Sequence, residues 1–262
     1  TGSDTYYGGS YDEAEAHCHP LNYALGIAKA ALSAGAKIYE NSPATSYKVL
    51  DDHVRVNTKN GSIKADRIVL ACNGYLENLE KSLTSKILPM NNYIVATKPL
   101  DDETVQKINP KDIAFADSRF VINYFRMSAD KRLLFGGGEN YSQELSKNIV
   151  PIVTRPLEKI YPFLKGIKID YAWGGKLAIT MNRLPFFASL HNEKVISAQG
   201  YSGQGVALAS YSGKIVSEKI TGTGEVFDIM SKIPRPSFPG GRFLRNPSMK
   251  IGMLYYSLLD RI

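Results

Sequence analysis

A glycine-rich turn between an apolar strand and a helix is the segment of this sequence best suited to hold a ligand. It follows the apolar run 194–198 and has glycine at its first, fourth and last positions. Glycine lets the backbone approach a ligand closely, and the start of the next helix presents free N–H groups and a positive dipole end. We expect contact with a phosphate, a pyrophosphate or an electron-rich ring carbonyl; a tight turn without a ligand is the alternative. The turn consists of Gly200, Tyr201, Ser202, Gly203, Gln204 and Gly205.

A second stretch with binding potential follows the short apolar run 67–72, which has the composition of a strand buried on both faces. Asn73 and Gly74 come directly after this run, and Ala71 and Cys72 close it. Ligand crevices in α/β proteins form at the carboxyl ends of strands. A small cysteine at such a position is otherwise ordinary packing.

Two histidines flank a cysteine at residues 17–19, which raises the question of a metal site. Three consecutive side chains do not easily face one ion, and no second group of ligands lies nearby in the sequence. We therefore expect no metal. His19 could face a pocket as an acid, a base or a hydrogen-bond donor, or it could simply fix the start of the helix that follows.

Three familiar motifs are each incomplete. Residues 200–204 lack the last glycine of a nucleophile elbow, and 213–215 lack the hydroxyl residue of a P-loop. Residues 222–224 follow a helix and lack the third glycine of a dinucleotide fingerprint. The sequence therefore contains no complete dinucleotide-binding motif.

Composition excludes several classes of protein. The 262 residues are 44% hydrophobic with a net charge of +7, which is ordinary globular composition. The basic residues are scattered, so we expect no nucleic-acid partner. No apolar run reaches the ~18–20 residues that cross a bilayer. Two cysteines do not form a disulfide framework, which predicts a cytoplasmic location. The chain starts at Thr1, so we expect it to be a piece of something longer.

The elements that must position these residues begin with a helix from Pro20 to about Gly35, whose apolar residues recur every three or four positions. Asn60-Gly61 predicts a hairpin turn with positive φ at both positions. The order of elements indicates an α/β domain with an inserted antiparallel unit. The strands expected around this turn are 37–39, 47–50, 54–58, 63–65 and 67–72.

The middle of the chain is rich in aromatic residues and predicts a mixed-sheet second domain. The aromatics Tyr93, Phe120, Tyr124 and Phe125 fit sheet packing by default, with a pocket lining as the alternative. A helix interrupted by Pro156 is expected over 149–161, and a helix over 205–220 follows the strand 194–198. From residue 227 we expect a Pro/Gly-rich tail that ends in an apolar helix. The remaining strands expected are 93–97, 119–126, 132–135, 167–173 and 177–181.

These segments, in this order, resemble the C-terminal part of the FAD-dependent amine and amino-acid oxidases of the D-amino-acid oxidase/glycine oxidase family. The likeness runs from 35–40 and 43–45 through 65–74 to Pro185 and the 200–205 turn. Four further segments resemble the gamma-glutamylputrescine oxidase group of that family. They are 19–22, 131–138, 168–173 and 238–256.

The resemblance implies an α/β (α+β) fold in which part of a Rossmann-like FAD-binding domain is combined with a mixed or antiparallel substrate domain. The implied division is 1–90 and 179–225 for the FAD-binding domain, 91–178 for the substrate domain and 226–262 for a wrapping tail. It places Thr45 on the adenosine side of FAD, Ala71, Cys72, Asn73 and Gly74 along it, and residues 200–205 near its ring system. We take His19, Tyr124 and Trp173 as pocket candidates for the substrate.

Two departures from the family refine the expected chemistry. Members that hold an amino-acid α-carboxylate place an arginine about three residues before the position of Thr180. Here Leu177 stands there beside Lys176, which favours an amine, such as a gamma-glutamylated polyamine, over a free amino acid. Some relatives attach flavin through a cysteine in this stretch. Gly174 and Gly175 offer no sulfur, so the resemblance implies non-covalent FAD.

The largest departure concerns the front of the family fold. Members begin with a βαβ unit that carries the glycine fingerprint for the FAD pyrophosphate, and no such unit occurs in these 262 residues. We therefore expect the back part of an amine oxidoreductase. The alternatives are a non-catalytic remnant, or one chain of a split flavoenzyme that a separate Rossmann-type chain completes.

Overall fold

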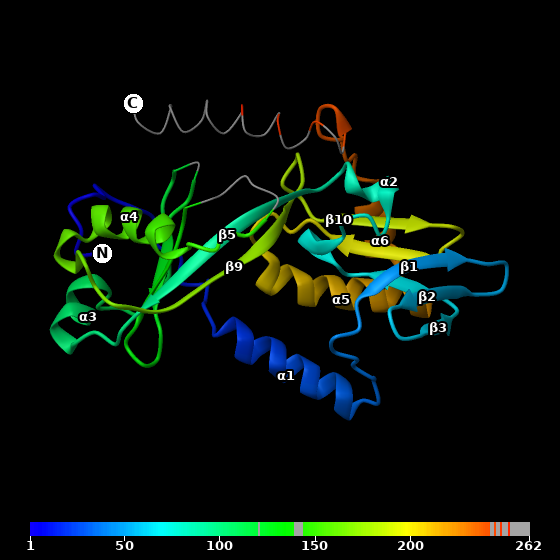
Figure 1. Cartoon of the computed structure of the whole chain (residues 1–262), viewed down its shortest axis with the longest axis horizontal. Coiled ribbons are helices and arrows are strands. Elements are labelled where there is room, and N and C mark those ends of the chain that lie inside the picture. The colour runs from blue at the N-terminus through cyan, green and yellow to red at the C-terminus, as the bar shows by residue number, and fades with distance from the viewer. Residues whose placement is uncertain (120, 139–143, 242–243, 245–246, 248–250, 252–262) are drawn as a thin grey trace. The chain divides into compact units, whose positions relative to one another are not determined.

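The chain forms two compact units in a computed structural model that describes residues 1–119, 121–138, 144–241, 244, 247 and 251 (Figure 1). The first unit comprises Thr1–Leu25, Asn91–Gly175 and Lys250–Ile262, and the second comprises Gly26–Met90 and Lys176–Met249. Three elements run across the boundaries between these ranges. They are α1 (Pro20–Ser33), β5 (Leu88–Thr97) and β9 (Ile169–Ile179).

The first unit is built on a five-stranded sheet in the order β6-β7-β8-β5-β9. The pairs β6–β7, β7–β8 and β8–β5 are antiparallel. Alternate residues of the strands, such as Val95, Phe125 and Phe135, lie buried on one face and form the centre of a hydrophobic core. The remaining strands are β6 (Phe115–Ala116), β7 (Tyr124–Met127) and β8 (Leu133–Gly136).

Two helices supply apolar residues to this core. α3 (Asp102–Ile108) begins at Asp101, whose carboxylate accepts the Thr104 N–H at 2.8 Å and caps the helix. α4 (Val150–Ile160) buries Val153, Leu157 and Ile160, one stripe at helical spacing, despite the internal Pro156. A 3-10 turn, Pro162–Leu164, follows.

The second unit contains two three-stranded sheets, ordered β1-β2-β3 and β10-β11-β4. In the latter, β11 is parallel to β4 and antiparallel to β10, and all five residues of β11 are buried. α5 and α6 pack against this sheet, because Ile215 and Phe227 belong to one buried cluster with Ile196. The elements are β1 (Ala44–Val49), β2 (Val54–Thr58), β3 (Ser62–Ala65), β4 (Ile68–Leu70), η1 (Asn73–Tyr75), α2 (Lys81–Thr84), β10 (Phe186–Leu190), β11 (Val195–Gln199), α5 (Gly205–Thr221) and α6 (Glu225–Lys232).

The helix predicted from Pro20 is confirmed as α1, but none of its residues is buried. Its apolar stripe is largely exposed, with Leu21 60% and Leu25 58% accessible. An apolar stripe stabilises a helix only when another surface covers it. The part of the chain that the structure describes does not cover this stripe.

Three local predictions for residues 37–72 are wrong. Residues 37–39 are not a strand, because no described strand pairs with them. The run 67–72 forms only β4, which lies at a sheet edge and leaves Val69 40% exposed, so it is not buried on both faces. The hairpin exists, but it closes between Thr58 and Gly61, and neither Asn60 nor Gly61 has a positive φ.

Further differences concern extents. The strands expected at 167–173 and 177–181 are one strand, β9, which Gly174 and Gly175 do not interrupt. The strand expected at 119–126 is shorter, since β7 starts at Tyr124. The tail expected from 227 contains α6 instead. Phe120 and the terminal helix predicted near residue 253 lie outside the described residues.

The mixed sheets and helices confirm the expected α/β (α+β) class. The compact units divide at residues 25, 90, 175 and 249. The four functional ranges expected from the sequence, 1–90, 91–178, 179–225 and 226–262, stay a prediction, because compactness alone does not assign a role to a range.

Candidate functional site

The glycine turn after β11 has an unusual backbone. Gly200, Ser202 and Gly203 have φ values of 77°, 51° and 100°, a region that disfavours most side chains. The N–H of Gly200 donates to Oδ1 of Asn73 at 3.1 Å, which joins two segments that lie 127 residues apart in sequence. Two of the stretches predicted to bind cofactor therefore meet in the second unit.

The end of β9 completes this cluster. The N–H of Ser202 donates to the carbonyl of Ala178 at 2.9 Å, and its Oγ accepts the N–H of Thr180 at 3.3 Å. Thr180 is 1% exposed. The turn is thus held on both sides by hydrogen bonds, which fixes the strained residues in place.

The segment that follows β4 is held in the same way. Asn73 has a φ of 49° and starts the one-turn helix η1. The Tyr75 hydroxyl accepts the backbone N–H of Lys176 at 3.0 Å, and Lys176 Nζ lies 3.5 Å from the Glu77 carboxylate. Burial raises the pKa of the Cys72 thiol, so this thiol stays neutral near pH 7.

The start of α5 is open to a ligand. Its N-cap residue, Gln204, makes no side-chain cap hydrogen bond. A Cβ placed on Gly203 would meet nothing within 4 Å, so the backbone there borders open space. Free N–H groups and a positive helix end suit an anionic or electron-rich group. These residues therefore fit the FAD ring that the resemblance assigns to this turn.

Two predicted cofactor residues lie elsewhere in the second unit or at its surface. Thr45 sits on β1, at an irregularity in the β1–β2 register, and its hydroxyl donates to the Asn57 carbonyl at 3.2 Å. Ala71 is exposed. No described hydrogen bond joins either residue to the Asn73–Gly200 cluster, so their roles stay predictions.

The three pocket candidates all fall within the first unit. His19 is exposed, and its Nδ1 accepts the Asn22 N–H at 3.3 Å, an interaction that caps α1. Tyr124 lies on β7 and donates to Oδ1 of Asn92. Trp173 lies on β9 and is 44% exposed. No described contact brings these three side chains together.

Sequence reasoning missed two residues beside Tyr124. Asn92 is its hydrogen-bond acceptor, and Arg126 lies on the same face of β7. The two-residue spacing of Tyr124 and Arg126 would have placed them together, because side chains alternate along a strand. Asn92 carries no comparable signal, since its role depends on pairing between distant strands.

Among the residues that the structure describes, no group of three His, Cys, Asp or Glu side chains could hold an ion, and the expectation of no metal stays a prediction. His17 contacts the Asp112 carbonyl through Nε2 at 2.9 Å, whereas Cys18 is exposed.

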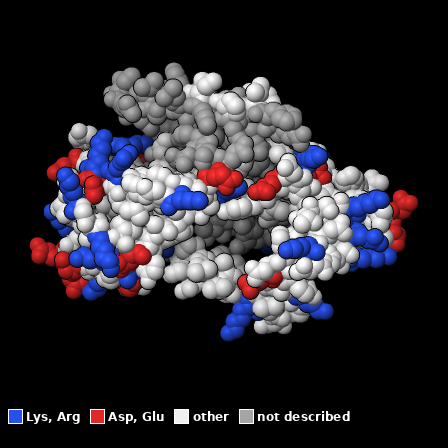
Figure 2. All heavy atoms as spheres, in the orientation of Figure 1, with Lys and Arg blue, Asp and Glu red and all other residues white. Residues whose placement is uncertain are grey.

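The described helices include none that is long and apolar enough to span a bilayer. On the face seen in Figure 2, basic and acidic side chains are interspersed.

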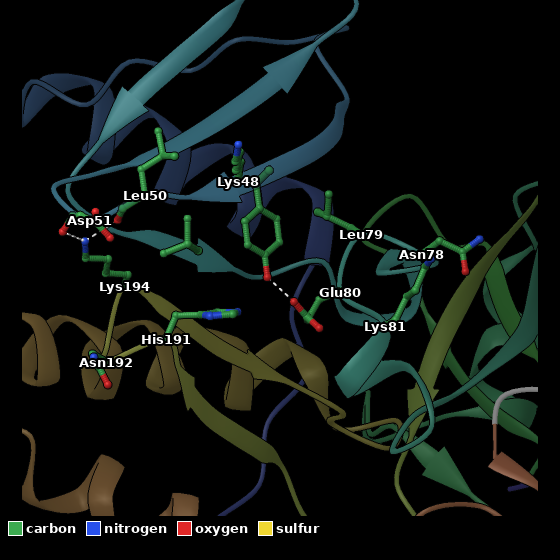
Figure 3. A pocket seen from close by; sticks show the side chains of 12 residues that line it. Lys48, Leu50, Asp51, Asn78, Leu79, Glu80, Lys81, His191, Asn192 and Lys194 are labelled. Atoms are coloured by element: carbon green, nitrogen blue, oxygen red, sulfur yellow. Dashed lines mark hydrogen bonds between the residues drawn. The ribbon is translucent and has the colours of Figure 1, made fainter.

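A cavity of about 710 Å³ in the second unit shares no residue with the predicted site. The Glu80 carboxylate, labelled in Figure 3, accepts a hydrogen bond from the Tyr47 hydroxyl. Lys194 Nζ donates to the Leu50 carbonyl at 2.6 Å on another side. Hydrogen bonds from Ser82 and Tyr47 keep the pKa of Glu80 low even though partial burial opposes this. Glu80 and Lys194 therefore each have hydrogen-bond partners within this unit.

Comparison with characterised proteins supplies the family. The chain is 37% identical to the probable oxidoreductase OrdL of Haemophilus influenzae over 99% of this chain and 60% of that protein. It is 36% identical to the gamma-glutamylputrescine oxidoreductase of Escherichia coli over 99% of this chain and 61% of that protein. The chain thus spans about three-fifths of the length of these relatives.

Solved structures share the fold. L-proline dehydrogenase from P. horikoshii matches 77% of this chain and 55% of its own, with a TM-score of 0.63 and 24% identity. Glycine oxidase from Geobacillus kaustophilus matches 74% of this chain and 52% of its own, with a TM-score of 0.61 and 21% identity. The model of the family described as FAD dependent oxidoreductase matches residues 1–219. This chain belongs to that family of FAD-dependent oxidoreductases.

Proposed function

We propose that this chain is part of an FAD-dependent oxidoreductase that converts a C–N bond of an amine into an imine, which water then hydrolyses. The family assignment supports the redox chemistry. The names of three relatives support the amine: gamma-glutamylputrescine oxidoreductase, sarcosine oxidase subunit beta and glycine oxidase. The observation that carries the proposal is the hydrogen bond from Gly200 to Asn73, which joins the segment after β4 to the turn 200–205, the proposed cofactor turn.

We assign FAD binding to residues of the second unit and amine binding to residues of the first unit. Bound FAD supplies the acceptor for the two electrons and the hydrogen removed from the substrate. The backbone at Gly203 and Gly205, at the start of α5, would stabilise negative charge on the flavin ring. Tyr124 and Trp173 would line the amine. We propose no catalytic base, because a neutral amine can lose a hydride without one.

Three positions of β9 refine the proposal: Leu177 bears on the substrate, and Gly174 and Gly175 bear on how FAD is held. Leu177 occupies the place where the resemblance expects a carboxylate-binding arginine, which favours an amine such as a gamma-glutamylated polyamine over a free amino acid. Gly174 and Gly175 provide no sulfur for attachment, so we propose non-covalent FAD. The two-cysteine composition keeps the cytoplasm as the proposed compartment.

The second unit leaves an edge where further polypeptide would fit. β4 has a neighbour on one side only, residues 37–39 lack a pairing partner among the described strands, and Gly26–Ser33 of α1 buries nothing. We propose that sequence beyond these 262 residues, on the same or a separate chain, carries the dinucleotide fingerprint and covers this edge. The alternative, which the same exposed surfaces allow, is a non-catalytic remnant.

The visible absorption spectrum tests the proposal first. A purified chain that retains the absorption of oxidised flavin holds the cofactor alone. A colourless, folded chain would contradict binding by this chain alone. Co-purification of a Rossmann-type partner that restores the colour would identify a split enzyme, and its absence would favour the remnant. With flavin bound, oxygen uptake on polyamines, gamma-glutamylated amines and glycine tests the substrate; preference for glycine would overturn the Leu177 argument.

A further inference from the structure

One face of the sheet in the first unit carries polar side chains next to half-buried apolar ones. Along β7, Phe125 and Met127 are buried in the core, whereas Tyr124 and Arg126 point to the opposite face and are half-buried. The pairing places Arg126 opposite Leu134 and Tyr124 opposite Gly136. This face is therefore neither packed like the core nor fully solvated.

Gly136 lets Tyr124 lie across the sheet. A Cβ at Gly136 would overlap the Tyr124 ring, so the ring passes directly over the glycine. The Tyr124 hydroxyl thereby reaches Asn92, one strand further on, and donates to its Oδ1. Ile94 and Leu134, both half-buried, flank this arrangement. The result is a surface with an apolar middle and polar groups at its ends.

Arg126 differs in its partners from Arg132, the residue before β8. Arg132 bonds Asp130 and Asp170, each at 2.6 Å. Arg126 bonds only carbonyl oxygens, that of Met127 at 3.1 Å and that of Cys18 at 3.0 Å. Among the described residues no carboxylate pairs with it. A guanidinium has five N–H donors, so several remain for another acceptor.

A half-buried guanidinium without a countercharge is well placed to receive an anion. Planar carboxylates match the guanidinium fork and form two parallel hydrogen bonds with it. Tyr124 and Arg126 are two residues apart on one strand, which spaces their positions by about 7 Å. One elongated molecule can therefore contact the tyrosine and the arginine together.

We propose that Arg126 binds a carboxylate of the substrate that is remote from the amine that is oxidised. The proposal rests on the proposed amine oxidoreductase and adds a specificity-determining residue to it. Leu177 leaves no arginine at the position that would hold an α-carboxylate beside the reacting carbon. Arg126 instead recognises the far end of an amine that also carries an acid group, while Tyr124 and Leu134 contact the chain between the two ends.

Binding measured by isothermal titration calorimetry on the full chain tests this role. The probes are gamma-glutamylputrescine, which carries a carboxylate, and putrescine, which does not. We expect the wild type to bind gamma-glutamylputrescine at least about tenfold more tightly, the effect of one charge-assisted bidentate contact. Arg126→Met should remove most of this preference and leave putrescine binding unchanged, and Arg126→Lys should restore part of it.

A matched control separates recognition from general charge or folding effects. Arg155→Met removes an exposed cation of α4 and should change the affinity for neither probe. Equal affinity for the two probes in the wild type, no binding of either, or an equal loss of both in Arg126→Met would overturn the role of Arg126. Flavin content is a separate readout: a preference for the carboxylate in a chain that never acquires flavin would retain Arg126 and overturn the proposed function.

Discussion

The sheet of the first unit and the helix α1 both have regular apolar patterns, but only the apolar residues of the sheet are buried. The sheet, the helices α3 and α4 and the segments next to them bury thirteen of the described residues in one cluster, including Phe125, Phe135 and Tyr161. α1 has an apolar stripe of comparable regularity, yet none of its residues is buried. An apolar pattern therefore specifies which face seeks cover, and only a second surface supplies the stabilisation.

The two units also differ in how their candidate functional residues are supported. The core of the first unit fixes the two residues that we propose to bind substrate, because Tyr124 and Arg126 share β7 with buried Phe125. In the second unit the turn 200–205, which we propose to bind FAD, follows the fully buried strand β11, whereas β4 has one edge without a partner among the described strands. Both units have buried cores of their own, and the proposal of further polypeptide rests on the unpaired edge of β4 and the exposed stripe of α1.

The largest expected effect tests this contrast directly. Phe135→Ala removes a fully buried ring and should lower the free energy of unfolding by about 3–5 kcal/mol. Leu25→Ala, at a 58% exposed site of α1, should change it by less than about 0.5 kcal/mol. Urea unfolding followed by the fluorescence of Trp173, the single tryptophan, gives both values. Losses of similar size would remove the contrast.

Two glycine substitutions should cause the next largest changes in the free energy of unfolding. Gly136→Ala places a methyl group where the Tyr124 ring lies, and should destabilise the first unit by about 1–3 kcal/mol. Gly213→Ala lies in α5, where a Cβ meets nothing within 4 Å, and should stabilise the second unit by about 0.5–1 kcal/mol. Thermal unfolding measured on the two variants should shift in opposite directions; a shift in the same direction would contradict the packing described.

The cofactor turn offers a smaller effect that is confined to the second unit. Asn73→Ala removes the acceptor of the Gly200 N–H and should cost about 1–2 kcal/mol. Asn73→Asp keeps an oxygen acceptor at the same place and should retain most of the stability. Hydrogen exchange of the Gly200 amide measures the bond itself. Unchanged exchange in Asn73→Ala would show that this hydrogen bond does not hold the turn.

The dependence of stability on pH is the smallest expected effect. Hydrogen bonds from Arg132 and Lys168 lower the pKa of Asp170 in the folded state. A depressed folded pKa stabilises above the unfolded pKa, which is about 3.9, and this contribution disappears as pH falls through the folded value. Acid titration of the Trp173 fluorescence should show a steeper loss below pH ~4 in the wild type than in Asp170→Asn. Identical curves would contradict the pairing.

Local patterns predicted elements well where the partner surface is close in sequence. The hairpin of β2 and β3, the buried strand β11 and the helix α5 all follow from composition and turn residues. The prediction of a strand at 37–39 was wrong because no described strand pairs with it. The run 67–72 was wrongly predicted to be buried on both faces because β4 has a pairing partner on one side only. The pattern alone does not reveal how many partners a strand has.

The candidate site was predictable to a similar degree. The glycine turn and Asn73 were found separately from their residue types, and the fold adds the hydrogen bond that joins them. Arg126 was missed, because its distinction is the lack of a carboxylate partner among the described residues, and partners depend on tertiary structure. Asn92 and its contact with Tyr124 were missed for the same reason.

Flavin content on reconstitution tests the central claim most directly. The chain would be co-expressed with the part of the Escherichia coli gamma-glutamylputrescine oxidoreductase that it does not match, about two-fifths of that protein. We predict a complex that contains flavin and that loses it in Gly203→Val, because the side chain fills the open space beside the start of α5. Failure of the two chains to associate, a complex without flavin, or flavin retained in full by the variant would contradict the account.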